Sequence, residues 1–174
     1  MRLLGAIIAG GGSIRFGSDK ATAVLDGRPL IEHVAEGLRG QTDHLVVCGC
    51  AWPGLASIAD WPEPELGPLG GLCAALRHAQ ANGFDAVLTA GCDVLPIPKS
   101  LGQRLLPGPA CIDGQRLLGL WPAALQPLLE GHLRSSDDRS IRSWVTLCGA
   151  REVRVAEDLY NLNTPADLER LAQR

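Results

Sequence analysis

The segment IIAGGGSIRFGSDKA (residues 7–21) runs from an apolar stretch into three consecutive glycines and then to the cations Arg15 and Lys20. The apolar stretch, LLGAIIAG (residues 3–10), is continuous, which is typical of a parallel strand that is buried on both faces. Glycine loses the most conformational entropy on folding, so three in a row indicate a place where a ligand approaches bare backbone. Phosphate suits such a place, because free N–H groups and nearby cations both attract it. We therefore predict a strand followed by a phosphate-binding loop.

Apolar runs and helical periodicities alternate along the following part of the chain. Buried strands are predicted at residues 44–49 and 85–91, and helices at residues 29–40 and 70–83. Pro29 suits the first position of its helix, because its fixed φ is already helical. Alternating strands and helices predict right-handed crossovers, and hence an α/β fold with a Rossmann-like, mostly parallel sheet and helices on both faces.

The second half of the chain departs from this alternation. Asp113-Gly114 is expected to form the turn of a β-hairpin insertion, and Pro127 to break or kink the helix around it. Thr164 can cap the last helix, with Pro165 at its first position. The predicted ranges are 110–121 for the hairpin, 122–133, 140–149 and 163–174 for the helices, and 151–156 for a short strand.

Length and composition limit the class of protein. The chain has 174 residues, which predicts a single domain over residues 1–174. A net charge of −3 argues against a general nucleic-acid binder. No apolar segment approaches the roughly 20 residues that span a bilayer, so we expect no membrane partner. The six cysteines lack the spacing of a zinc site, and Cys48-Gly49-Cys50 is one residue short of a redox CxxC pair. Free thiols in a reducing cytoplasm are the expected state.

The glycine loop fits neither of two common phosphate-binding templates. A dinucleotide-binding fingerprint that starts at Gly10 needs glycine at position 15, where this chain has Arg15. A Walker-type loop from Gly12 needs lysine directly after Gly17, but two residues intervene before Lys20. We predict a phosphate loop of another design, in which both cations reach one triphosphate. The alternative is a tight turn with two solvated cations.

The glycine loop, the end of the second strand and Asp93 are expected at the carboxyl edge of the sheet, where ligands of such sheets bind. Three segments besides the glycine loop carry candidate residues. Asp93 follows a predicted strand and is suited to hold Mg²⁺, although a turn residue that bonds its own backbone is the alternative. GPLGG (residues 67–71) opens a helix, and on its own it is best explained as close packing at the helix entry. In NLNTP, Asn163 is expected to cap the last helix, whereas Asn161 has no such explanation.

These motifs, in this order, resemble those of the molybdenum cofactor guanylyltransferases. The family's opening loop, LAGGxxxRMGxDK, matches IAGGGSIRFGSDK here, with Ile8 and Phe16 as the departures. Its GPLxG segment corresponds to GPLGG, its strand-end CD to GCD, and its closing NxNTPxDL to NLNTPADL. The match extends from about Leu4 to Leu171, and four ordered motifs together are specific.

The resemblance implies a nucleotidyltransferase fold and a reaction of GTP with molybdopterin that yields the guanine dinucleotide form of the cofactor and pyrophosphate. It implies Mg²⁺ as cofactor, and contacts with molybdoenzyme apoproteins or chaperones. It also implies roles for residues of this chain at matching positions. Arg15, Lys20 and Asp93 are the implied catalytic residues, with Asp93 on the metal; Ala9, Gly10, Gly11, Gly12, Lys20, Asp60, Gly67 and Pro68 contact the nucleotide, and Asn161 and Asn163 face the pterin.

Some alternatives remain open. Better-known members carry an asparagine-containing segment after the second strand, where this chain has Cys48-Gly49-Cys50, so nucleotide contacts there are in question. The nearest alternative function is that of a cytidylyltransferase that uses CTP and the same pterin. The AGG and GPLGG sequences of this chain favour GTP as the substrate. A carrier that binds nucleotide or cofactor without catalysis is a rival of another class. A transferase that forms sugar nucleotides is disfavoured by the size of the chain.

Overall fold

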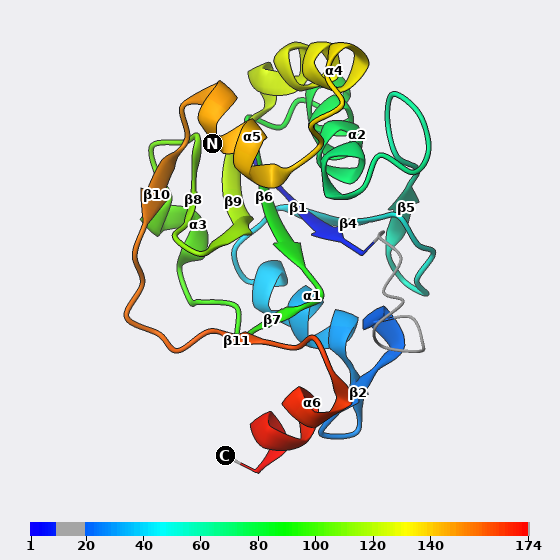
Figure 1. Cartoon of the computed structure of the whole chain (residues 1–174), viewed down its shortest axis with the longest axis vertical. Coiled ribbons are helices and arrows are strands. Elements are labelled where there is room, and N and C mark those ends of the chain that lie inside the picture. The colour runs from blue at the N-terminus through cyan, green and yellow to red at the C-terminus, as the bar shows by residue number, and fades with distance from the viewer. Residues whose placement is uncertain (10–19, 174) are drawn as a thin grey trace.

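The computed structural model describes residues 1–9 and 20–173, and its central feature is a seven-stranded sheet (Figure 1). Across the sheet the strands follow the order β10-β8-β9-β6-β1-β4-β5. In chain order they are β1 (Leu3–Ile8), β4 (His44–Cys48), β5 (Ala56–Ile58), β6 (Ala86–Gly91), β8 (Ala110–Ile112), β9 (Gln115–Pro122) and β10 (Arg151–Val153).

The sheet is mostly parallel. Strand β1 pairs in parallel with β4 on one side and with β6 on the other, and β5 extends the parallel set beyond β4. Strand β9 runs antiparallel to both β6 and β8, while β10 returns parallel to β8. The predicted fold class is therefore confirmed. The predicted hairpin is also confirmed, with its turn at Asp113-Gly114, and its two strands continue the main sheet rather than standing apart from it.

Apart from the short helix α3 (Leu101–Arg104), which was not predicted, the α-helices lie close to their predicted ranges. They are α1 (Leu30–Arg39), α2 (Pro68–Ala81), α3 (Leu101–Arg104), α4 (Gln126–Ser135), α5 (Ile141–Cys148) and α6 (Pro165–Ala172), with short 3₁₀ turns η2 (Lys20–Thr22) and η3 (Ala123–Leu125). None of the helices within the described ranges has the length and apolar character to cross a membrane.

Three prolines account for the differences at helix starts. Pro29 caps α1 with an extended backbone instead of occupying its first position, because it also pairs in the two-residue strand β3 (Arg28–Pro29). Helix α2 begins at Pro68, earlier than the predicted residue 70. Pro127 lies in the first turn of α4, directly after η3, so it marks a helix start rather than a kink.

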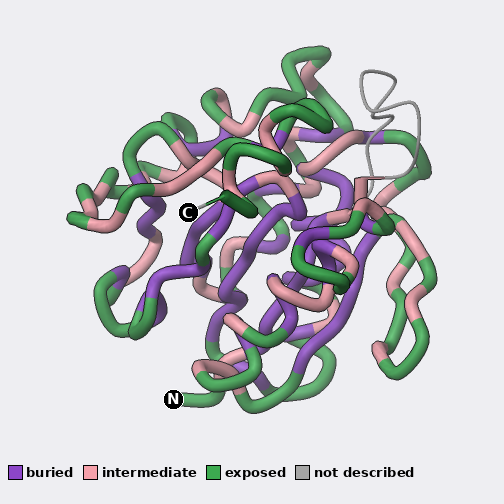
Figure 2. The backbone as a smooth tube through the Cα atoms, turned by 90° about the horizontal axis from the view of Figure 1, so that it is seen from below, coloured by how far each residue is buried: buried purple, intermediate pink, exposed green. Residues whose placement is uncertain are grey.

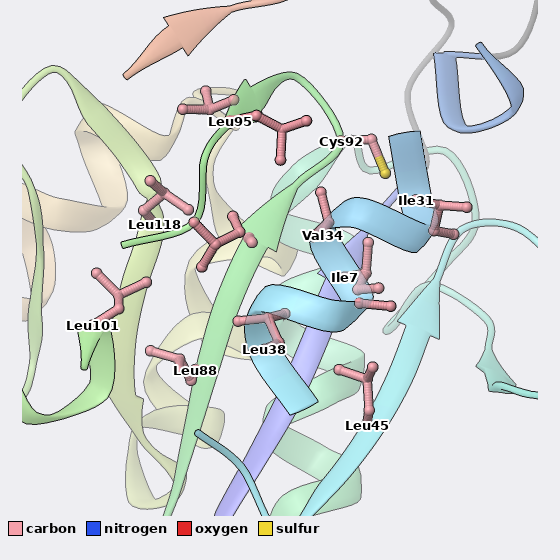
Figure 3. Packing of buried hydrophobic residues seen from close by; sticks show 14 of the residues in the cluster. Ile7, Ile31, Val34, Leu38, Leu45, Leu88, Cys92, Leu95, Leu101 and Leu118 are labelled. Carbon is pink, nitrogen blue, oxygen red and sulfur yellow. The ribbon is translucent and has the colours of Figure 1, made fainter. Parts of the chain in front are cut away.

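Helices cover both faces of the sheet, as predicted. Successive residues of β1 point to opposite faces, so Ile7 packs into a core that contains α1, and Leu4, Ala6 and Ile8 pack into a core that contains α2, α4 and α5. Figure 3 shows α1 with Ile31, Val34 and Leu38 lying over the strands of its face. The buried backbone forms the interior of the molecule in Figure 2, where exposed segments surround it.

Two small antiparallel pairs were not predicted. Strand β2 (Val24–Leu25) pairs with β3 through a turn at Asp26-Gly27, where both residues have positive φ, as hairpin turns of this kind require. Strand β7 (Val94–Leu95) pairs with β11 (Tyr160–Asn161). Figure 1 shows β11 beside β7, in the segment that leads into α6. The second pair therefore attaches the C-terminal segment to the residues that follow β6.

Candidate functional site

The candidate site lies at the carboxyl edge of the parallel strands. Strands β1, β4, β5 and β6 run in one direction and therefore end at the same edge. Ala9 follows β1 and donates its N–H to the carbonyl of Cys48, at the end of β4, over 2.9 Å. Asp60 follows β5, and Asp93 follows β6. The predicted ligands Gly10, Gly11, Gly12 and Arg15 lie outside the described residues.

A backbone hydrogen bond fixes the position of Asp93, while its carboxylate is available to bind a ligand. The N–H of Leu162 donates to the Asp93 carbonyl over 2.7 Å, which fixes the chain at this point. A Cβ at Gly91 would lie 2.6 Å from Oδ1 of Asp93, so only glycine allows this carboxylate to fold back over the strand end. Among the described residues, no side chain donates to the carboxylate or forms an ion pair with it. Asp93 is thus a half-buried oxygen ligand at the strand edge.

The segment 161–163 brings two asparagines to the same edge. Leu162 is fully buried, while Asn161 and Asn163 on either side of it are exposed, because alternate residues of an extended chain face opposite ways. Asn163 accepts a hydrogen bond at Oδ1 from Nζ of Lys20 over 3.0 Å. Asn161 accepts one at Oδ1 from Nε2 of Gln115, also over 3.0 Å. The end of the glycine loop, the hairpin and the C-terminal segment therefore meet here.

Asn163 does not cap α6, which corrects that prediction. Thr164 is the N-cap, as its position predicted, and its hydroxyl accepts from the Asp167 N–H within a capping box. Hydrogen bonds from Thr164 and from the Asn163 N–H hold the pKa of the Asp167 carboxyl below its ordinary value. Because Thr164 satisfies the helix end, the Asn163 side chain remains available to Lys20.

Asp60 lies under the entry to α2. Its Oδ1 is buried without a hydrogen-bond partner among the described residues. Burial raises the pKa of this carboxyl, and a hydrogen bond with the Leu66 backbone opposes that rise. A Cβ at Gly70 would lie 2.7 Å from Cβ of Leu66 and 3.0 Å from Oδ2 of Asp60, so glycine is needed for this close approach. An unsatisfied buried carboxylate oxygen is costly in folding, which makes Asp60 a candidate for ligand binding.

Trp61 anchors the loop that carries Asp60, a feature that the sequence did not reveal. The guanidinium of Arg77 stacks 3.8 Å from the centre of its ring, and its Nε1 donates to Oε2 of Glu130 over 2.9 Å. Glu130 also accepts from Gln126 and Arg134. Hydrogen bonds from Trp61, Arg134 and Gln126 lower the pKa of Glu130 to about 2, and the bond from Trp61 has the largest effect. Helices α2 and α4 thus hold the loop beside the sheet edge.

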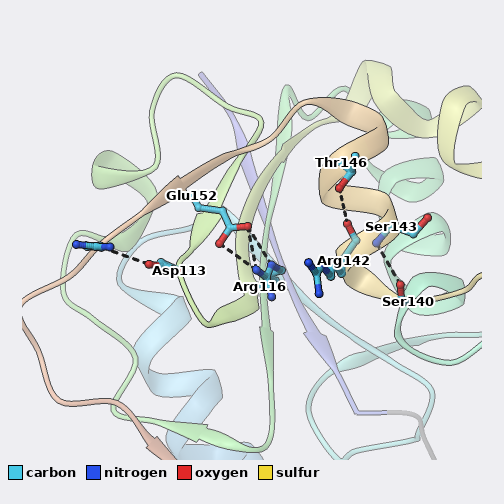
Figure 4. Close-up of polar contacts among 8 residues, drawn as sticks. Asp113, Arg116, Ser140, Arg142, Ser143, Thr146 and Glu152 are labelled. Carbon is cyan, nitrogen blue, oxygen red and sulfur yellow. Dashed lines mark hydrogen bonds and ion pairs between the residues drawn. The ribbon is translucent and has the colours of Figure 1, made fainter.

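The β8–β9 hairpin contributes a wall of the site. A cavity of about 190 Å³ is lined by Asp93 and Gly91 from the end of β6, Gln115 and Arg116 from β9, and Ile141 from α5. Figure 4 shows Arg116 against Glu152 of β10, with an N–O distance of 3.0 Å. No motif pointed to Gln115 or Arg116, because their contacts depend on the hairpin's position in the sheet.

Cys48-Gly49-Cys50, which stands where better-known family members have an asparagine-containing segment, lies at the same edge of the sheet. Cys48 is buried, and burial raises the pKa of its thiol to about 12, with the nearby Asp60 charge as a lesser cause. It is therefore an inert thiol at neutral pH. None of the six cysteines, all within the described ranges, forms a disulfide.

Comparisons with known proteins agree with this architecture. The sequence-family model described as MobA-like NTP transferase domain matches residues 5–155 of this chain. A molybdenum cofactor guanylyltransferase from Cereibacter sphaeroides is 38% identical, over 98% of this chain and 95% of the relative. A protein of the same name from Acidiphilium cryptum (strain JF-5) is 30% identical, over 96% of this chain and 92% of the relative.

Solved structures support the fold. Molybdopterin-guanine dinucleotide biosynthesis protein A from Archaeoglobus fulgidus superposes with a TM-score of 0.72 and 21% identity, over 98% of this chain and 97% of that one. A 4-diphosphocytidyl-2C-methyl-D-erythritol synthase superposes with a TM-score of 0.69 and 15% identity, over 99% of both chains. The chain therefore belongs to the family of MobA-like NTP transferase domains and is a nucleotidyltransferase.

Proposed function

We propose that this protein transfers GMP from GTP to the phosphate of molybdenum-molybdopterin, giving molybdopterin guanine dinucleotide cofactor and pyrophosphate. The observation that carries the proposal is the shared name, molybdenum cofactor guanylyltransferase, of relatives that are 30% and 38% identical over nearly the whole chain. The Lys20–Asn163 contact adds support, because it joins the segment proposed for the nucleotide to the segment proposed for the pterin.

The reaction needs alignment and charge neutralisation more than a general base. An oxygen of the acceptor phosphate attacks the α-phosphorus of GTP, the bond from that phosphorus to the bridging oxygen breaks, and pyrophosphate leaves. A phosphate monoester has a second pKa near 6, so the nucleophile is already largely ionised at neutral pH. This fits the sequence of residues 7–21, which contains neither His nor Glu.

Lys20 and Arg15 are the cations that we propose for the phosphates, where negative charge develops during transfer. Asp93 fits Mg²⁺, because its half-buried carboxylate has no donor among the described side chains and Mg²⁺ prefers few protein oxygens beside phosphate. When bound there, Mg²⁺ supplies positive charge at the phosphate oxygens. Asn161 and Asn163 hold the acceptor in this proposal, because both are exposed polar side chains on the segment that Leu162 joins to Asp93.

The nucleotide extends along the sheet edge in this proposal. Asp60 follows β5 and Asp93 follows β6, and β4 and β1 lie between these strands. Three strand spacings separate the two by roughly 14 Å. The triphosphate lies near Asp93 and the base near Asp60 and the entry to α2 at Gly67-Pro68. The Asp60 carboxylate, whose Oδ1 has no hydrogen-bond partner among the described residues, accepts the ring and exocyclic N–H groups of guanine, which cytosine does not present in the same arrangement.

Calorimetric titration with GTP, CTP and ATP, each with and without Mg²⁺, tests the proposal. We expect GTP to bind most tightly, Mg²⁺ to strengthen that binding, and the variant Asp93→Asn to lose the strengthening. GMP transfer to molybdopterin is then measured with radiolabelled GTP. A preference for CTP contradicts the choice of base and favours the cytidylyl reaction. Binding of GTP without any transfer contradicts catalysis and favours a carrier.

A further inference from the structure

Asn161 has a fixed backbone beside Asp93. It pairs with Val94 in the β11–β7 ladder, and the next residue, Leu162, donates its N–H to the carbonyl of Asp93 over 2.7 Å. The side chain of Leu162 is fully buried, so that of Asn161 is directed to the opposite, exposed side. An exposed asparagine side chain still has rotational freedom, and something must select one orientation if it is to bind a ligand reproducibly.

Gln115 is in position to fix the orientation of the Asn161 side chain. It is the first residue of β9, where the hairpin register sets it opposite Ile112, a buried residue. Its side chain is half-buried and lines the cavity that also contains Asp93. Its Nε2 donates to Oδ1 of Asn161 over 3.0 Å, a contact between residues 46 positions apart. Among the described residues, Gln115 is the one side chain that hydrogen-bonds the Asn161 side chain.

This contact determines what Asn161 can offer to a ligand. With Oδ1 accepting from Gln115, the Nδ2 group of Asn161 keeps its hydrogens to donate to a ligand. Asn163 has the same polarity, since its Oδ1 accepts from Lys20. Both asparagines therefore offer N–H donors, which suit a phosphate oxygen and do not suit a metal ion.

We infer that Gln115 is a positioning residue for the acceptor, orienting the Asn161 amide so that its N–H groups meet the acceptor phosphate near Asp93. The assignment rests on the proposed function, in which Asn161 binds the acceptor. The two substrates then have different partners in the site. Gln115 and Asn161 act on the acceptor phosphate that attacks. Lys20 and Asp93 act on the GTP phosphates.

Two substitutions of Gln115 distinguish orientation from simple packing. Gln115→Ala releases the Asn161 side chain, and the KM for molybdopterin is expected to rise about 5-fold, with kcat within about 2-fold of wild type. Gln115→Glu keeps the size but can only accept, so it turns the Asn161 amide over and presents Oδ1 to the phosphate. The KM for molybdopterin is then expected to rise roughly 10-fold or more. The KM for GTP is expected to remain unchanged in both.

The background variant Asn161→Ala completes the test. In that background neither substitution of Gln115 is expected to raise the KM for molybdopterin further, because the amide that it orients is absent. Arg154→Gln, on an exposed arginine that pairs with Asp113 of the same hairpin, is the matched control with unchanged kinetics. The melting temperature of each variant shows whether the hairpin remains folded.

The possible results separate the two levels of inference. A wild-type protein that transfers no GMP to molybdopterin overturns both the proposed function and the role of Gln115. An active wild type overturns the role of Gln115 alone if Gln115→Glu keeps the wild-type KM for molybdopterin. The same conclusion follows if the effects persist in the Asn161→Ala background, or if the KM for GTP changes instead.

Discussion

Lys20 donates a hydrogen bond from Nζ to Oδ1 of Asn163 over 3.0 Å, and 143 positions of sequence separate the two residues. Lys20 begins η2, immediately after the glycine loop, and Asn163 precedes the cap of α6. The contact therefore links the two ends of the chain across the candidate site. In the proposed reaction it also links the cation at the leaving phosphates to the segment that holds the acceptor.

Lys20→Ala is expected to lower the turnover of GMP transfer by about 10²–10³, because one charge-stabilising group at the phosphates is lost. The melting temperature is expected to stay close to that of wild type, since Lys20 is not part of a buried core. Steady-state transfer with radiolabelled GTP measures the effect. Lys99→Ala removes the other lysine of the chain, which is exposed, and serves as the control. An equal loss of turnover in both variants would contradict the assignment of Lys20 to the phosphates.

The parallel half of the fold was predictable because local sequence determines it. The apolar runs at β1, β4 and β6 and the helical periodicities of α1 and α2 have a single reasonable interpretation. Strand direction then brings Ala9, Cys48 and Asp93 to one edge, so the general position of the site followed from the order of elements, whereas Asp60 follows β5, a strand that was not predicted.

The contacts that complete the site were not predictable in the same way. Strands β7 and β11 have two residues each, too few for any periodicity, and they form only because distant segments meet. Asn163 has the sequence context of a helix cap, yet Thr164 takes that role and leaves Asn163 to Lys20. Gln115 is an ordinary strand residue until the hairpin register brings it to Asn161. Each of these is decided by tertiary packing, which a local pattern does not record.

Gly91→Ala is expected to disable the metal site without unfolding the protein. The added Cβ would lie 2.6 Å from Oδ1 of Asp93, and the carboxylate can move away, whereas the strand need not. Mg²⁺ is then expected to strengthen GTP binding less than in wild type, and turnover is expected to fall by roughly 10-fold or more. Calorimetry with and without Mg²⁺ measures the first effect.

Gly131→Ala is the matched control for Gly91→Ala. Gly131 is an exposed residue within α4, and a Cβ there meets no other atom. We expect unchanged binding and turnover, with a small gain in stability from the better helix propensity of alanine. If Gly91→Ala responds to Mg²⁺ as wild type does, the Asp93 carboxylate does not hold the ion in the orientation described here.

Glu130→Gln is expected to destabilise the protein at neutral pH and to flatten its stability in acid. Hydrogen bonds from Trp61, Arg134 and Gln126 lower the pKa of Glu130 from 4.5 to about 2. A lowered pKa means that the stabilisation is complete above pH 4.5 and is lost as the pH falls from about 4.5 to about 2. The difference in unfolding free energy between wild type and variant should therefore shrink over that interval.

Denaturant unfolding at several pH values between 2 and 7 measures this difference for Glu130→Gln. The control Glu169→Gln changes an exposed glutamate of α6, and its difference from wild type is expected to be small at every pH. A gap between Glu130→Gln and wild type that stays constant down to pH 2 would show that the ionised Glu130 contributes no stabilisation through the Trp61 contact.

Asp60→Asn is expected to stabilise the free protein and weaken its binding of GTP. Burial raises the pKa of Asp60, so the folded state is disfavoured by its charge above that pKa, and this cost disappears as the pH falls toward the ordinary value of 3.8. Asparagine lacks the charge and can keep the hydrogen bond from Leu66. The variant should therefore melt higher than wild type at pH 7, and the gain should shrink in acid.

The same substitution removes the carboxylate that we propose for guanine, so the Kd for GTP is expected to rise roughly 10-fold or more. Thermal unfolding with and without GTP records both effects, because a weaker ligand raises the melting temperature less. Glu63→Gln, on an exposed carboxylate in the same loop, is expected to change neither. A variant that melts higher and still binds GTP as tightly as wild type would make Asp60 a buried charge without a role in choosing the base. A variant that melts lower would mean that its carboxylate is satisfied by a partner in the free protein, and the reason for assigning it to a ligand would be lost.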